Sequence, residues 1–211
     1  MNSQRFLHKV AIVTGASSGI GRTTAIAFAR EGAKVIVACR RQTEGQETVR
    51  MIEQAGGAGR FVETDVSRAT DAERMVSETI RTFGRLDFAF NNAGIAESPM
   101  PFVEQSEEAF DRVMGVSIKG VWLCMKAEIP EILKAGGGAI VNMGSISSVV
   151  GIPGAPIYTA SKHAVLGLTK ATALEFAKSG IRINAVLWLC SGEAAFMAGH
   201  ALHVDGGYTV Q

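Results

Sequence analysis

The chain has 211 residues, and its 21 lysines and arginines nearly balance 20 acidic residues, for a formal net charge of +1. This length suits one α/β domain and is short for two, so we expect a single domain over residues 1–211. The near-neutral charge gives no reason to expect nucleic acid or an anionic membrane as a partner. No apolar run reaches the roughly 18 residues of a membrane span, and we expect a cytoplasmic protein.

Cysteine and histidine do not point to a metal or disulfide site. Cys39, Cys124 and Cys190 are an odd number of cysteines in apolar segments, which predicts reduced, structural thiols, with a catalytic thiol as the alternative. His200 and His203 have no third ligand at metal-like spacing, so we expect no metal site.

The first predicted strand, residues 9–14, is a continuous apolar run that is typical of a strand buried on both faces. A turn with the spacing G-x-x-x-G-x-G follows, and then a helical pattern. Such a turn lets a pyrophosphate approach the helix N-terminus, whose free N–H groups suit an anion, although an ordinary loop is the alternative. The residues predicted to bind this group are Gly15, Ser17, Ser18, Gly19, Ile20 and Gly21.

The second predicted strand spans residues 34–39, and Arg40 and Arg41 follow its end. In dinucleotide-binding folds this position faces the adenosine ribose, where an acid accepts from the 2′-hydroxyl and an arginine accommodates a 2′-phosphate. The two arginines therefore favour NADP(H) over NAD(H), with a merely solvated pair as the alternative.

Strands and helices continue to alternate along the chain. This pattern predicts a doubly wound parallel sheet of about seven strands, Rossmann-like, with helices on both faces. The further elements are helices over residues 43–55, 71–83 and 107–133 and strands over 60–64, 86–90, 139–143, 181–186 and 201–204.

The segment from residue 139 to 178 contains the strongest catalytic candidates. Ser145 follows a short apolar strand, and Tyr158 and Lys162 stand four residues apart at the start of a helical pattern, hence on one helix face. A neighbouring ammonium stabilises a phenolate, which would make Tyr158 a usable acid or base. Ser145 could hold a substrate oxygen beside the phenol. Taken alone, the pair could equally be an ordinary amphipathic contact.

The motifs together resemble the short-chain dehydrogenase/reductase family over nearly the whole chain. They are residues 14–21 (TGASSGIG), residues 91–94 (NNAG), and Ser145 placed thirteen residues before the Tyr158–Lys162 motif. The resemblance implies an NAD(P)-dependent oxidoreductase that interconverts a carbonyl and a secondary alcohol on a small molecule. It implies Tyr158 as general acid/base, with Lys162 supporting it and binding the nicotinamide ribose. It also implies a homo-oligomer, most often a tetramer.

Further cofactor contacts follow from the resemblance alone. Asp65, with Val66 beside it, is implied to touch the adenine edge, and a turn or helix-capping role for Asp65 is the alternative. Asn92, Ala93 and Gly94 are implied to brace the sheet and lie along the cofactor ribose.

Three positions depart from the family pattern. Cys39 replaces the usual acid, which with Arg40 favours NADP(H), while Ser18 stands where many phosphate-preferring relatives have a basic residue. Ser117 replaces the family's catalytic Asn, which helps to hold a water in the proton relay that ends on the lysine. The shorter serine predicts a weakened or water-rebuilt relay.

The chain is unusually short after the strand at residues 181–186. The family continues with a turn, a substrate lid and a helix, whereas this sequence passes almost directly to the last strand, so about 40 residues are absent at the 186/187 junction. Parallel strands need a longer crossover, which favours a disordered segment left out of the sequence over a true deletion. Ser117 and this gap leave open an alternative function, a dinucleotide-binding module with little or no turnover.

Overall fold

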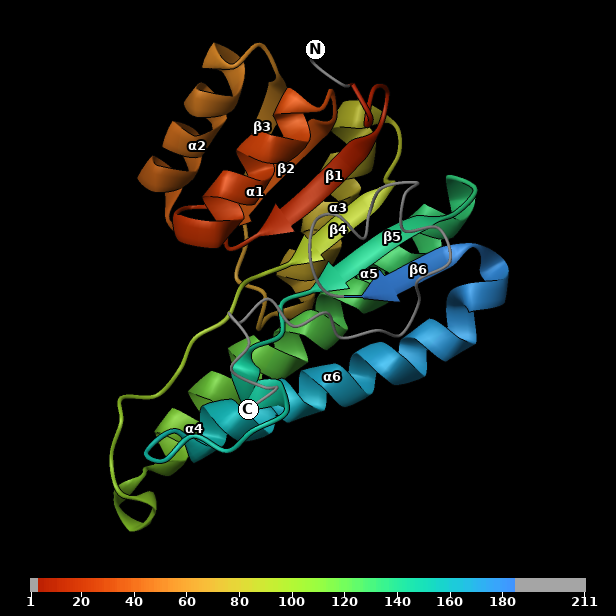
Figure 1. The fold of residues 1–211 in the computed structure, drawn as a ribbon. Coiled ribbons are helices and arrows are strands. Elements are labelled where there is room, and N and C mark those ends of the chain that lie inside the picture. The colour runs from red at the N-terminus through yellow and green to blue at the C-terminus, as the bar shows by residue number, and fades with distance from the viewer. Residues whose placement is uncertain (1–3, 185–211) are drawn as a thin grey trace.

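The computed structural model describes residues 4–184 of the chain. Six strands in this range form one parallel sheet with the order β3-β2-β1-β4-β5-β6 (Figure 1). The strands are β1 (Val10–Thr14), β2 (Lys34–Cys39), β3 (Ala58–Glu63), β4 (Phe88–Asn91), β5 (Gly138–Asn142) and β6 (Ile181–Asn184).

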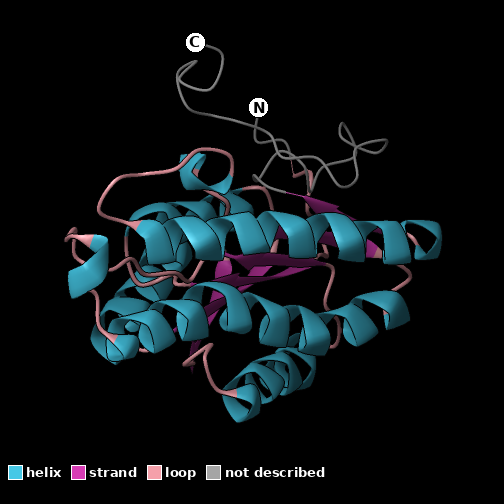
Figure 2. Ribbon diagram, turned by 90° about the horizontal axis from the view of Figure 1, so that it is seen from below, coloured by secondary structure: helices cyan, strands magenta, loops and turns pink. Residues whose placement is uncertain are grey.

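Helices cover both faces of this sheet, which lies between two helical layers in Figure 2. The α-helices are α1 (Gly19–Arg30), α2 (Gln42–Gln54), α3 (Ala69–Phe83), α4 (Glu107–Met114), α5 (Gly120–Lys134) and α6 (Pro156–Phe176). Shorter helical segments are η1 (Phe102–Glu104), η2 (Gly115–Lys119), η3 (Ile146–Ser148) and η4 (Ala177–Ser179).

Alternate residues of each central strand face opposite layers. Ile12 of β1 packs in a core with side chains of α3, α5 and α6, whereas Ala11 and Val13 pack in a second core with α1 and α2. Burial on both faces explains why the strands read as continuous apolar runs. The predicted fold class is confirmed, while the expected strand at residues 201–204 and the 186/187 junction lie outside the described residues.

The helix expected over residues 107–133 is present, but its middle is π-helical rather than α-helical. The π-helical segment η2 separates α4 from α5 and places Ser117 at its centre. Gly120 marks a close approach, because a Cβ there would lie 2.7 Å from Val66 Cγ2. Helix α4 buries only Val113 completely, and its Phe110 is 47% exposed.

The order of the strands reverses between β1 and β4, which are neighbours in the sheet but not in the chain. Such a switch point opens a crevice at the carboxyl ends of the strands, where ligands of doubly wound sheets bind. Thr14 ends β1 there, and its Oγ1 accepts hydrogen bonds from the backbone N–H groups of Asn92 (3.0 Å) and Ala93 (3.1 Å). These bonds hold the turn after β4 against the end of β1.

Candidate active site

A cleft of about 560 Å³ lies at this switch point. Most residues that the sequence predicts for cofactor binding line it: Gly15, Ser17, Ser18, Ile20, Arg40, Arg41, Asp65, Val66, Asn92, Ala93 and Gly94. Cys39, Thr64, Ile95 and Val116 complete the lining. The structure therefore brings together side chains from three separate strand ends and the glycine turn.

The glycine turn is tightly folded beneath this cleft. Gly15 has a φ of +66°, in the left-handed region that favours glycine. A Cβ on Gly21 would lie 2.4 Å from the carbonyl oxygen of Gly15, so a side chain there would displace the turn. The turn leads into α1, whose first turn contains no acidic residue and whose N-cap, Ser18, makes no side-chain cap bond within the described part of the chain. The N–H groups that open α1 thus suit an anion.

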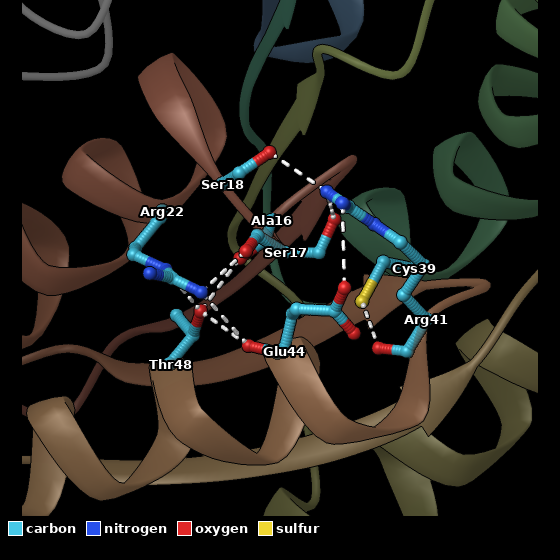
Figure 3. Close-up of polar contacts among 8 residues, drawn as sticks. All are labelled: Ala16, Ser17, Ser18, Arg22, Cys39, Arg41, Glu44 and Thr48. Carbon is cyan, nitrogen blue, oxygen red and sulfur yellow. Dashed lines mark hydrogen bonds and ion pairs between the residues drawn. The ribbon is translucent and has the colours of Figure 1, made fainter.

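Arg41 extends over the glycine turn. Its Nη2 donates to the hydroxyls of Ser17 and Ser18, both at 2.8 Å, and its Nη1 lies 3.4 Å from a carboxylate oxygen of Glu44 (Figure 3). Cys39, where the family has an acid, provides no negative charge, because burial raises the pKa of its thiol. This edge of the cleft therefore presents a guanidinium and two hydroxyls.

Arg22, which sequence reasoning missed, joins the glycine turn to α2. Its Nη2 donates to the carbonyls of Ser17 (2.5 Å) and Glu44 (3.2 Å), and its Nε donates to Thr48 Oγ1 at 3.0 Å (Figure 3). Thr48 in turn donates to the carbonyl of Ala16 at 2.9 Å. The turn is thus held by residues that lie far along the chain.

Asp65 lines the cleft and also makes local turn contacts. Its Oδ1 accepts from the N–H (3.0 Å) and the hydroxyl (2.7 Å) of Ser67. Burial alone would raise the pKa of this carboxyl, but the Ser67 hydrogen bonds and the charge of Arg40 lower it below its usual value. The turn role is observed, and the adenine contact stays a prediction.

Tyr158 and Lys162 lie together in the first turns of α6, as their spacing predicts. Lys162 Nζ is 5.6 Å from the centre of the Tyr158 ring and donates to the carbonyl of Met143, just after β5, at 2.7 Å. Lys162 is almost fully buried, and this burial lowers its pKa to about 8. A titratable amine is thereby held beside the phenol at the carboxyl edge of the sheet.

Ser117 and Lys162 both approach the turn after β4. A Cβ on Gly94 would be 3.6 Å from both Lys162 Nζ and Ser117 Oγ, so the turn after β4 passes close to both groups. Ser117 Oγ donates to the carbonyl of Ile95 at 2.8 Å and accepts from its N–H at 3.0 Å. The hydroxyl thus anchors the backbone that follows the NNAG turn.

Ser145 follows β5 at the start of η3, which packs against α6. Its hydroxyl accepts from the N–H of Ser147 at 3.2 Å, while its own N–H donates to Ser148 Oγ at 3.1 Å. This reciprocal cap fixes the half-buried side chain, and among residues 4–184 the hydroxyl proton of Ser145 has no acceptor.

Glu97 was also missed by sequence reasoning. It is buried, and its carboxylate accepts hydrogen bonds from the backbone N–H groups of Ile157 and Tyr158. The partners are about sixty residues apart, and no local pattern in the sequence signals the contact.

Three further features concern the described part of the chain. Among residues 4–184, no group of three or more His, Cys, Asp or Glu side chains could hold a metal ion. None of the helices in the same range is long and apolar enough to cross a membrane. Cys39 and Cys124 are buried free thiols, and Cys190, His200 and His203 lie outside the described residues.

A parallel sheet with a glycine turn and a cleft at its switch point defines a dinucleotide-binding α/β protein of the doubly wound type. The family profile described as short chain dehydrogenase matches residues 9–190. The chain therefore belongs to the short-chain dehydrogenase family, a family of oxidoreductases that use NAD(P).

Individual relatives agree with this assignment. An uncharacterized oxidoreductase of Thermotoga maritima is 45% identical over 182 residues, which cover 86% of this chain and 71% of that protein. An A-factor type gamma-butyrolactone 1′-reductase (1S-forming) of Streptomyces virginiae is 36% identical over 246 positions, covering 96% of both chains. Because 246 exceeds the 211 residues present here, that alignment opens gaps in this chain.

A solved structure has a similar fold. It is assigned to the short-chain alcohol dehydrogenases, comes from Sinorhizobium meliloti 1021, and has a TM-score of 0.94 with 31% identity over 99% of each chain. The fold and the family are thus supported independently by sequence and by structure.

Proposed function

We propose that this protein is a dehydrogenase or reductase that interconverts a small-molecule carbonyl compound and a secondary alcohol. The observation that carries the proposal is the buried Lys162 ammonium, 5.6 Å from the ring centre of Tyr158, beside a cleft at the switch point of the sheet. A phenol with a cationic neighbour is suited to general acid/base chemistry. The reductase related over 96% of both chains supports the same reaction class.

The cleft fits a nicotinamide dinucleotide. The N-terminus of α1 offers N–H groups to a pyrophosphate, and the turn of Asn92, Ala93 and Gly94 lines the same cleft. Arg41, held by Ser17 and Ser18, is positioned for a 2′-phosphate and favours NADP(H) over NAD(H). Bound in this way, the cofactor supplies or accepts the hydride.

The protein's own residues handle the proton and the substrate oxygen. In reduction, Tyr158 Oη donates its proton to the carbonyl oxygen, and in oxidation it takes the proton from the alcohol. The hydroxyl proton of Ser145 donates to the same substrate oxygen and orients it. Lys162 stabilises the phenolate that results and binds the nicotinamide ribose, while Ser117 keeps the backbone at Ile95 in place.

The first test is turnover of NADPH with a panel of ketones, by wild type and by Tyr158→Phe. We expect Tyr158→Phe to lose about 10²- to 10⁴-fold in kcat, because the proton donor is removed, while NADPH still binds. Turnover that survives Tyr158→Phe would disprove the proton-donor role. Binding of NADPH without oxidation by wild type would instead favour a dinucleotide-binding module.

We also propose that the protein assembles as a homo-oligomer, specifically a tetramer. Leu174 on α6 is 82% exposed and Trp122 on α5 is 46% exposed, so large apolar side chains of both helices face outward in this chain. An assembly that covers Leu174 would remove this apolar surface from water.

A further inference from the structure

Helix α6, which contains Tyr158 and Lys162, begins without a cap of its own. Its N-cap residue is Ala155, which has no polar side chain, and Pro156 follows at the first position without an N–H group. The next two N–H groups, those of Ile157 and Tyr158, have no carbonyl four residues back inside the helix. Most helices satisfy such groups with a Ser, Thr, Asp or Asn at the N-cap.

Glu97 supplies the missing acceptors from another part of the chain. Its Oε1 accepts from the N–H of Ile157 at 2.8 Å and from that of Tyr158 at 3.2 Å, and its Oε2 accepts from Tyr158 at 3.0 Å. The residue is only 5% exposed. A buried carboxylate is costly unless it is hydrogen-bonded, and the positive end of a helix is a favourable partner.

The segment that ends in Glu97 is itself anchored at the cleft. It starts at Gly94, where an added Cβ would lie 3.6 Å from both Lys162 Nζ and Ser117 Oγ. One residue on, the N–H and carbonyl of Ile95 are both bonded to Ser117 Oγ. Residues 94–97 thus connect the lining of the cleft with the first turn of α6.

We infer that Glu97 is a positioning residue for Tyr158, tying the first turn of α6 to the wall of the cofactor cleft. The inference rests on the proposed function, because it gives this contact a part in the reaction. Tyr158 is only the third residue of α6, where helices fray unless they are capped. A phenol displaced by about 1 Å loses much of its proton-transfer efficiency.

The central experiment compares Glu97→Ala with the double variant Glu97→Ala/Ala155→Asp. The second replacement gives α6 a local N-cap of the usual kind, but does not restore the connection to residues 94–97. We expect Glu97→Ala to lower kcat by about 10- to 100-fold, with the Kd for NADPH unchanged. The double variant should regain thermal stability without regaining kcat. If adding Ala155→Asp to Glu97→Ala restores both thermal stability and kcat, Glu97 is only a helix cap and the inference is wrong.

Two further variants guard against misreading a folding defect. Glu97→Gln keeps the size and one acceptor oxygen, so it should fold and lose a smaller part of kcat than Glu97→Ala. Ser106→Ala removes the N-cap of α4, where Ser106 Oγ accepts from Ala109 N–H at 3.2 Å, and should lower stability while kcat is unchanged. A kcat loss in Ser106→Ala as large as that in Glu97→Ala would show a general stability effect and overturn the inference.

Amide hydrogen exchange separates failure of this inference from failure of the proposed function. If wild type turns over no carbonyl substrate, the proposed reaction fails, but the contact is still tested. We expect Glu97→Ala to speed exchange at Tyr158 and at Ile95, and Ala155→Asp to restore protection only at Tyr158. Unchanged exchange at Ile95 in Glu97→Ala would contradict the coupling between the cleft wall and α6.

Discussion

Arg41 is a long, half-exposed side chain that its neighbours hold in one position. Two serine hydroxyls accept from the same Nη2, and Glu44 balances part of the charge at 3.4 Å. A guanidinium held in this way loses little conformational freedom when it binds a phosphate. Arg40, its neighbour in sequence, also lines the cleft and acts on the pKa of Asp65.

The proposed NADP(H) preference can be tested at this residue. We expect Arg41→Ala to raise the Kd for NADPH by about 10- to 100-fold and to leave the Kd for NADH nearly unchanged, because only NADPH has the 2′-phosphate. Fluorescence titration with both nucleotides measures the effect. Arg40→Ala is the comparison and should weaken NADPH less. Equal weakening of both nucleotides by Arg41→Ala would contradict a phosphate contact.

Helix α5 is joined to the sheet by a buried polar network as well as by apolar packing. Asn91 of β4 donates to Glu128 Oε2 at 3.0 Å and to Asn142 Oδ1 of β5 at 3.1 Å, and Asn142 donates to Thr169 Oγ1 of α6 at 3.0 Å. Glu128 is fully buried, and this burial raises its pKa to about 7, against an opposing effect of the Asn91 hydrogen bond. Near neutral pH the network therefore contains a carboxyl group that readily takes up a proton.

The pH dependence of stability follows from this shift. The carboxyl binds a proton more tightly in the folded than in the unfolded chain, so its stabilising contribution is complete below about pH 4.5 and is lost as pH rises to about 7. Glu128→Gln keeps the shape of the side chain and cannot titrate. As the pH rises through this range, we expect the free energy of unfolding of Glu128→Gln to increase relative to that of wild type, by up to about 3 kcal/mol. Urea denaturation at several pH values measures the difference.

Glu131→Gln is the matched control for that series. Glu131 lies on the same helix but is partly exposed and pairs with Lys134 at 2.7 Å. A partly exposed pair contributes little to stability. The free energy of unfolding of this variant should therefore differ from that of wild type by the same amount at every pH. If the difference in the free energy of unfolding between Glu128→Gln and wild type is also constant with pH, the pKa of the Glu128 carboxyl is not raised in the folded protein.

The proposed homo-oligomer is a property of the whole molecule. We expect wild type to elute as a multiple of the chain mass, and Leu174→Glu to shift it toward smaller species, because a charge would be buried in the interface. Mass photometry and light scattering measure the distribution. Met51→Glu, at an exposed apolar position of α2, should leave the assembly unchanged. A monomeric wild type would disprove the assembly.

The order and type of the elements were predictable because each depends on a pattern of neighbouring residues in the sequence. Continuous apolar runs indicated the buried strands, and the glycine spacing indicated the turn before α1. The π-helical segment η2 within the long helix was not predictable, since no spacing in residues 115–119 distinguishes it from an α-helix. Only the packing of Gly120 against Val66 and the bonds of Ser117 to Ile95 distinguish the π-helical segment.

The sequence by itself determined the fold class, the family and the candidate residues, because glycine turns and four-residue helical spacing act over short distances along the chain. The tertiary structure decided which distant groups meet. Lys162 reaches the carbonyl of Met143 and the turn at Gly94, and Glu97 reaches the first turn of α6 across about sixty residues. A parallel sheet brings separate strand ends to one edge, and contacts made there depend on the register and packing of the whole fold rather than on local pattern.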